Sequence, residues 1–167
     1  MTLRTILYAP SVHTGGGYVL LRSLIANWPV DRPLFAILDR RAEAQLLPGG
    51  NVHILMWVKR SFTSRWQAEV LLASSSFAGD LVFCLHGLPP LLNSPSKKIV
   101  FLQNRLLFGL QSLSRFRLKT AARLSFERFM SRVFRHRVAE YIVQTLLFNE
   151  SFCNGIKSPV ECPLRRN

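Results

Sequence analysis

Short apolar runs alternate along this chain with segments of helical period, and this alternation constrains the fold more than any other feature. The runs are nearly continuous in hydrophobic residues, as in strands that helices cover on both faces of a sheet. The predicted strands are Leu3–Ala9, Pro33–Leu38, Val52–Val58, Asp80–His86, Lys98–Leu102 and Val138–Gln144. The predicted helices are Tyr18–Asn27, Arg40–Leu47, Ser61–Ser75, Phe116–His136 and Leu146–Asn154. The pattern predicts an α/β fold, a doubly wound, Rossmann-like parallel sheet of about six strands with flanking helices.

Length and composition exclude several classes of protein. The chain has 167 residues, of which 49% are hydrophobic, so we expect one domain with a substantial core. No apolar stretch reaches the roughly 18 residues of a membrane-spanning helix, and Arg4 interrupts the only apolar run near the N-terminus, so we expect a cytoplasmic protein. Three widely spaced cysteines predict neither a disulfide framework nor a zinc site, and Cys84 is expected in the core.

Three consecutive glycines, Gly15, Gly16 and Gly17, lie where the first predicted strand leads into a helix. Glycines there permit a tight turn and close approach of a ligand, and the helix N-terminus favours a phosphate or a sugar oxygen. Leu20 occupies the third glycine position of the dinucleotide-binding pattern, so that pattern is incomplete. Asp39 follows Gly17 by 22 residues and is suited either to a ribose contact or to capping the next helix. The alternative is that the glycines only make the turn.

Most of the positive charge lies in one segment. Between Lys97 and Arg137 there are eleven basic residues and one acid, which accounts for +10 of the net +13. In the predicted helix Phe116–His136 the apolar side is expected to face the core and the arginines to face outward. The apolar side consists of Ala122, Phe126, Phe129, Met130 and Val133, and the proposed membrane-facing side of Arg117, Arg128, Arg132 and Arg135.

Three explanations suit such a basic surface. An anionic membrane surface would attract it, and the neighbouring leucines would add reversible attachment. A solvated arginine face without a partner is the plainer alternative. Nucleic acid is the other polyanion, but the sequence shows no helix-turn-helix, RNP aromatic pattern or zinc-finger spacing, so nucleic acid is not favoured.

Taken together and in order, five segments resemble the N-terminal domain of GT-B glycosyltransferases of the family 4 type. They are Ile6–Ala9, Gly15–Gly17, Asp80–His86, Val100–Asn104 and Tyr141–Thr145. The resemblance implies that residues 1–167 form the acceptor-side half of a two-domain GT-B architecture, with the active site between the domains. It implies a nucleotide-sugar donor, a glycan or lipid-linked acceptor, a retaining mechanism, polysaccharide biosynthesis at the inner face of the membrane, and no metal or tightly held cofactor.

The donor-binding domain of that architecture is not in this sequence. Its signature is a pair of glutamates eight positions apart, and no two of the six glutamates here have that spacing. We therefore expect either a separate donor-domain polypeptide as partner or a truncated form in which the isolated chain is inactive.

The resemblance implies the following site residues, none of them assigned a catalytic role. Gly15, Gly16 and Gly17 would face the donor phosphates and the acceptor. Gln103, Asn104 and Arg105 are expected to line the sugar and acceptor pocket. His13 and His86 are candidate substrate contacts; the alternatives are a solvent-exposed loop residue for His13 and a structural, hydrogen-bonded histidine for His86. Many members of that family carry a histidine beside the transferred sugar where this chain has Gln103 and Asn104. Alternatives are a non-catalytic basic module for membrane or partner binding, and a degenerate dinucleotide-binding domain built on Gly15, Gly17 and Asp39.

Overall fold

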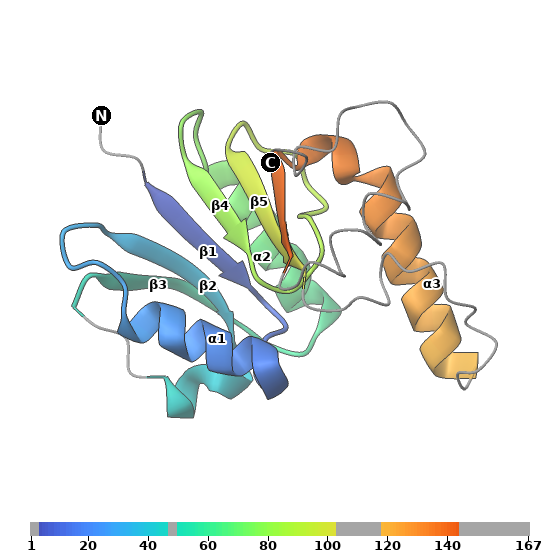
Figure 1. The fold of residues 1–167 in the computed structure, drawn as a ribbon, viewed down its shortest axis with the longest axis horizontal. Coiled ribbons are helices and arrows are strands. Elements are labelled where there is room, and N and C mark those ends of the chain that lie inside the picture. The colour runs from blue at the N-terminus through green and yellow to red at the C-terminus, as the bar shows by residue number, and fades with distance from the viewer. Residues whose placement is uncertain (1–3, 47–49, 103–117, 144–167) are drawn as a thin grey trace, which may run out of the picture.

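The six strands form one sheet in which every neighbouring pair is parallel (Figure 1). The computed structural model describes residues 4–46, 50–102 and 118–143. The strands are β1 (Thr5–Ala9), β2 (Leu34–Asp39), β3 (Val52–Val58), β4 (Leu81–Cys84), β5 (Lys97–Leu102) and β6 (Glu140–Val143). Their order, β3-β2-β1-β4-β5-β6, is that of a Rossmann-like doubly wound sheet. The predicted fold class is therefore confirmed, and the direction of the connections reverses between β1 and β4.

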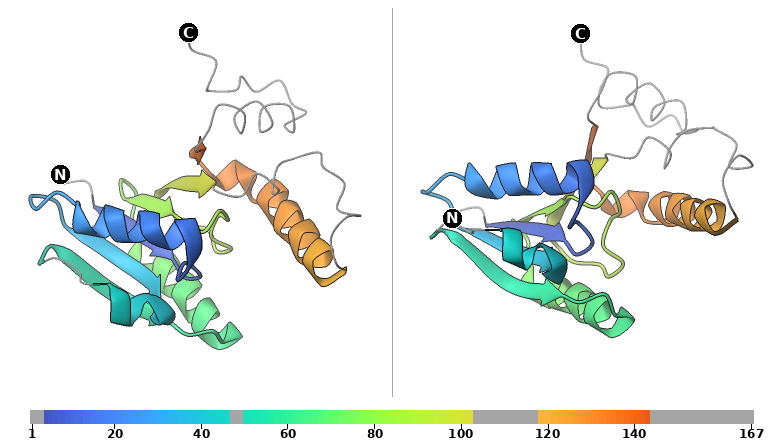
Figure 2. Two further views of the ribbon diagram at one scale, coloured as in Figure 1. Left: turned by 60° about the horizontal axis from the view of Figure 1, so that its bottom comes forward. Right: turned by 90° about the horizontal axis from the view of Figure 1, so that it is seen from below.

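Helices cover both faces of the central strands. After β1 comes α1 (Gly15–Ala26), after β2 the 3-10 helix η1 (Arg40–Gln45), and after β3 comes α2 (Phe62–Ser75). The helices α1 and α2 lie on opposite faces of the sheet (Figure 2). Between β5 and β6 the chain forms α3 (Leu118–Val133) and a short 3-10 turn, η4 (Arg135–Arg137). The predicted helix Leu146–Asn154 lies outside the described residues.

Side chains of β1 divide between two buried layers, which explains why its apolar run is continuous. Leu7 and Ala9 belong to the layer under α1, whereas Ile6 and Tyr8 belong to the layer under α2. All four are almost completely buried. Cys84 joins the second layer as a free thiol, as the sequence predicts, and its burial raises the pKa of that thiol.

The packing of α3 corrects one prediction. Its apolar side, expected in the core, is exposed: Phe126 keeps 62%, Phe129 61% and Val133 42% of its surface in solvent. Among the described side chains of α3, the buried ones are Leu124 and Ser131, on the opposite side of the helix. The physical reason is placement, because α3 extends beyond the β6 edge of the sheet instead of lying flat on it (Figures 1 and 2). An amphipathic period shows that a helix has two sides, but not which side meets the protein.

Candidate functional site

The turn between β1 and α1 leaves the helix N-terminus open. Gly15 begins α1 with φ +68°, a left-handed conformation that favours glycine. A Cβ atom placed on Gly15 or Gly16 would have no other atom within 4 Å. As far as the structure describes the chain, the Thr14 side chain makes no capping hydrogen bond. Thr14, Gly15 and Gly16 are exposed, so an anion or a sugar oxygen can approach the first turn of α1, where the helix N-terminus favours it.

Asp39, at the end of β2, lies next to this turn and is held by Arg41. Its Oδ1 accepts from the backbone N–H and Nε of Arg41, both at 2.9 Å, and its Oδ2 accepts from Nη2 at 2.7 Å. His13 Nδ1, in the β1–α1 turn, is 3.6 Å from Asp39 Oδ2. Although burial opposes ionisation, the bonds from Arg41 and the proximity of His13 lower the pKa of Asp39.

These bonds decide between the two roles predicted for Asp39. Its side chain caps η1, so the capping role is the one the structure shows. Because both carboxylate oxygens are already bonded to Arg41, a ribose hydroxyl would have to compete for them with a charged donor.

His86 follows β4 on the other side of the reversal in strand order. The Leu85 N–H donates to Tyr8 O at 3.0 Å, which places His86 against β1. The His86 ring packs edge-on against the Tyr8 ring, with centroids 5.2 Å apart. Among the described residues, its buried Nδ1 has no hydrogen-bond partner. Burial and the nearby Arg65 lower the pKa of His86 to about 4, so the imidazole is neutral at pH 7.

A buried carboxylate fixes the loop that follows His86. Glu69 Oε1 accepts from the Tyr8 hydroxyl at 2.6 Å, and Oε2 accepts from the N–H groups of Leu91 and Leu92 at 2.8 and 3.2 Å. Burial and the Glu69 carboxylate raise the pKa of Tyr8, which keeps its hydroxyl protonated as the donor. Glu69 therefore joins β1, α2 and the β4–β5 loop.

The structure brings together most of the predicted site residues that it describes. Gly15–Gly17 and His13 follow β1, His86 follows β4, and these two strands are neighbours. Gln103, Asn104 and Arg105, together with Arg117, lie outside the described residues. Sequence reasoning missed the Tyr8–Glu69 pair. The sequence signal that could have revealed it is the position of Glu69 on the buried side of α2, between Ala68 and Leu72.

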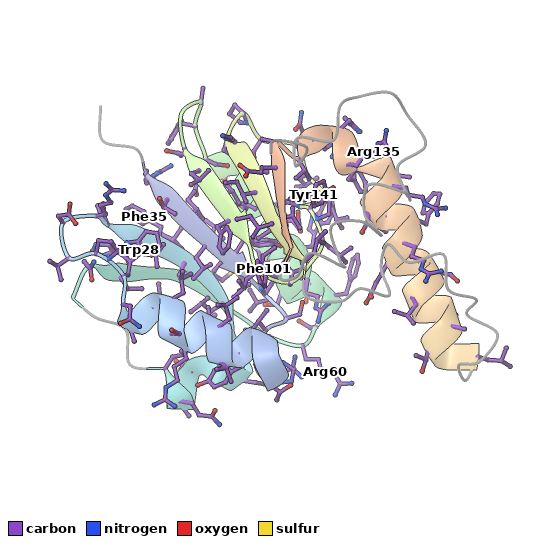
Figure 3. The ribbon with its side chains drawn as sticks, in the orientation of Figure 1. Trp28, Phe35, Arg60, Phe101, Arg135 and Tyr141 are labelled. Atoms are coloured by element: carbon purple, nitrogen blue, oxygen red, sulfur yellow. The ribbon has the colours of Figure 1, made fainter. Side chains whose placement is uncertain are left out.

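A hollow lies at the other end of the sheet, away from the β1–α1 turn. It has a volume of about 170 Å³ and is lined by Thr5, Leu7, Leu24, Trp28, Leu34, Leu81 and Phe83. Trp28 marks this amino end of the strands, and Phe101 lies near the carboxyl end (Figure 3). Its apolar lining offers nothing to a phosphate or a sugar, so it is separate from the candidate site.

Comparisons with known proteins add no family assignment. A scan against protein-family models and searches of curated proteins and of solved structures found no match to this chain. Within 4–46, 50–102 and 118–143, no group of three metal-ligating side chains is close enough to hold a metal ion. None of the helices described is long and apolar enough to cross a bilayer. The geometry of the carboxyl edge is thus the main evidence on function.

Proposed function

We propose that this chain is the acceptor-side domain of a GT-B type glycosyltransferase, which transfers a sugar from a nucleotide donor in combination with a donor domain. The observation that carries the proposal is the open, uncapped N-terminus of α1 beside the strand-order reversal. Ligands of open α/β sheets bind at such reversals, outside the carboxyl ends of the strands. In this proposal the acceptor is a glycan or a lipid-linked glycan at the cytoplasmic side of a membrane.

The described residues suit a reaction that depends on placement and charge. N–H groups in the first turn of α1 would stabilise negative charge on the departing nucleoside diphosphate, because Gly15 and Gly16 are exposed at the positive end of the helix. His86, neutral at pH 7, would offer a ring nitrogen to a sugar hydroxyl without adding positive charge. His13 is held near Asp39 and would contact the acceptor from the β1–α1 turn.

Binding at the glycine turn can be tested by NMR on the ¹⁵N-labelled full chain. Titration with a panel of nucleoside diphosphate sugars should shift the amide signals of Gly15–Gly17 and His86. Signals near the apolar hollow, such as that of Leu24, should stay in place. The Gly16→Val variant should keep the fold and lose the shifts, because its side chain enters the open space in front of α1. No shift at the glycine turn with any donor, or equal shifts in the variant, would contradict the proposal.

Catalysis needs a separate assay. Transfer of radiolabelled sugar should be measured with the chain alone and with a GT-B donor domain added as a second polypeptide. We expect turnover only in the mixture, and less of it with Gly16→Val. Ligand-induced shifts without turnover in either case would support a non-catalytic binding role instead.

A further inference from the structure

The exposed side of α3 is a continuous apolar surface. Leu118, Phe126, Phe129 and Val133, together with exposed Ala122, fall within one half of the helix at 100° per residue. We call these five residues the α3 apolar face. Leu124 and Ser131, on the opposite side, are the positions that the rest of the protein buries.

In a water-soluble domain the apolar side of an amphipathic helix packs against the core, whereas in α3 the apolar side is exposed. Exposed apolar side chains also lie on α2, where Phe62, Trp66 and Val70 keep 81%, 47% and 44% of their surface in solvent, but of these three only Phe62 is exposed by more than one half. Scattered apolar residues on a surface need no explanation, whereas a grouped apolar surface marks a contact with another apolar phase. The figures show α3 standing clear of the β-sheet, so a broad, flat surface can reach the helix without meeting the sheet first (Figures 1 and 2).

We propose that the α3 apolar face inserts into the interfacial region of an anionic lipid bilayer. The charge of the segment favours an anionic bilayer over other partners of this face. From Leu118 to Arg137 the chain has six basic residues and one acid, Glu127, so the apolar face belongs to a segment of net charge +5. A second copy of a chain with net charge +13 would meet its own charge there, whereas a bilayer with acidic headgroups offers both hydrocarbon and negative charge.

The proposal changes which side of α3 contacts the membrane. The sequence predicts contact through arginines with the apolar side in the core, whereas here phenylalanines insert and basic side chains such as Arg132 remain at headgroup level. Arg128, one of the arginines expected to face the membrane, is instead partly buried. Burial and the neighbouring Arg132 lower the pKa of its guanidinium. The inference does not rest on sugar transfer, since vesicle binding is measured without any nucleotide sugar.

The test is sedimentation of the full chain with vesicles made of equal parts phosphatidylglycerol and phosphatidylcholine. The double variant Phe126→Ser/Phe129→Ser should lower the partition coefficient of the protein between vesicles and buffer about tenfold or more. The reason is that the variant has no aromatic rings at these positions to transfer from water into the bilayer. Phe62→Ser on α2 is the matched control, since Phe62 is exposed at 81% but lies outside α3, and it should bind as the parent does. Circular dichroism spectra of all variants serve as the control that each of them is folded.

A fluorescent reporter locates the insertion. Phe129→Trp should shift its emission to shorter wavelength and be quenched by brominated lipid. The same readout in Phe126→Ser/Phe129→Trp should weaken.

Three results would overturn the proposal. The first is equal vesicle binding by the double serine variant and the parent. The second is equal binding to pure phosphatidylcholine, which would remove the role of charge. The third is a dimer in lipid-free buffer that the double serine variant dissociates, because a second copy would then cover the α3 apolar face.

Discussion

The Tyr8 hydroxyl donates a 2.6 Å hydrogen bond to Glu69 Oε1, and this bond connects the central strand of the sheet to α2. The other oxygen of Glu69 accepts two backbone N–H groups from the β4–β5 loop. A buried carboxylate is costly unless its oxygens are bonded, and here three donors reach it. The pair also supports the candidate site, because the ring of Tyr8 packs against His86.

Removing the charge of Glu69 should destabilise the protein. In Glu69→Gln an amide N–H₂ replaces one oxygen and faces either the Tyr8 hydroxyl or the N–H groups of Leu91 and Leu92. We expect a loss of about 2 kcal/mol in the free energy of unfolding, measured by urea denaturation. Glu43→Gln is the control, because Glu43 is exposed and lies 3.7 Å from Arg40, so its loss should be about 0.5 kcal/mol or less. Equal losses in the two variants would contradict the role assigned to Glu69.

His86 should make stability fall as the solution becomes mildly acidic. Its pKa is about 4 in the folded protein against an ordinary value of 6.5, so between these values the unfolded chain binds more protons. Stability therefore rises with pH from 4 to 6.5. Because His86 as a residue is only partly buried, we expect about 2 kcal/mol rather than the full equivalent of the shift. Urea midpoints of the parent and His86→Gln across this range should differ in slope. Parallel curves would show that His86 does not titrate on unfolding.

Arg4 and Asp80 should have an effect of the same sign as His86, but at lower pH. Asp80 Oδ2 accepts from Arg4 Nη2 at 2.6 Å and from the Phe77 N–H at 2.8 Å, and these bonds, against the opposing effect of burial, lower its pKa. The stabilisation is present above the ordinary aspartate pKa and is lost as the pH falls through the folded value. At pH 7, Asp80→Asn should cost about 1 kcal/mol. The exposed Asp31→Asn is the control and should change stability by about 0.5 kcal/mol or less. The Asp80→Asn difference should shrink as the pH falls below the ordinary aspartate pKa of 3.8.

The sequence predicts the fold well because a short run of apolar residues is enough to mark a buried strand. The predicted and observed bounds of β3 coincide at Val52–Val58, and the predicted helix Ser61–Ser75 begins one residue before α2, at its N-cap. The β1–α1 turn was also predictable, because three glycines after an apolar run have few other uses. Tyr8 and Glu69 were not, since a tyrosine in a strand resembles core and a glutamate in a helix resembles surface until the two elements are packed. The side of α3 that is buried was missed for the same reason, because it depends on where the helix lies relative to the sheet.

Two adjacent glycines should respond differently to substitution, and the contrast tests the β1–α1 turn. Gly15 has φ +68°, where a side chain is strained, so Gly15→Ala should lose about 1 kcal/mol in the free energy of unfolding. Gly16 lies in α1, outside that left-handed region, and a Cβ there meets no atom within 4 Å. Gly16→Ala should therefore be neutral or gain about 0.5 kcal/mol, because alanine is the better helix former. Thermal or urea unfolding of both variants measures the difference. If Gly16→Ala were as damaging as Gly15→Ala, the space in front of α1 would be filled, and a ligand could not approach the helix N-terminus there.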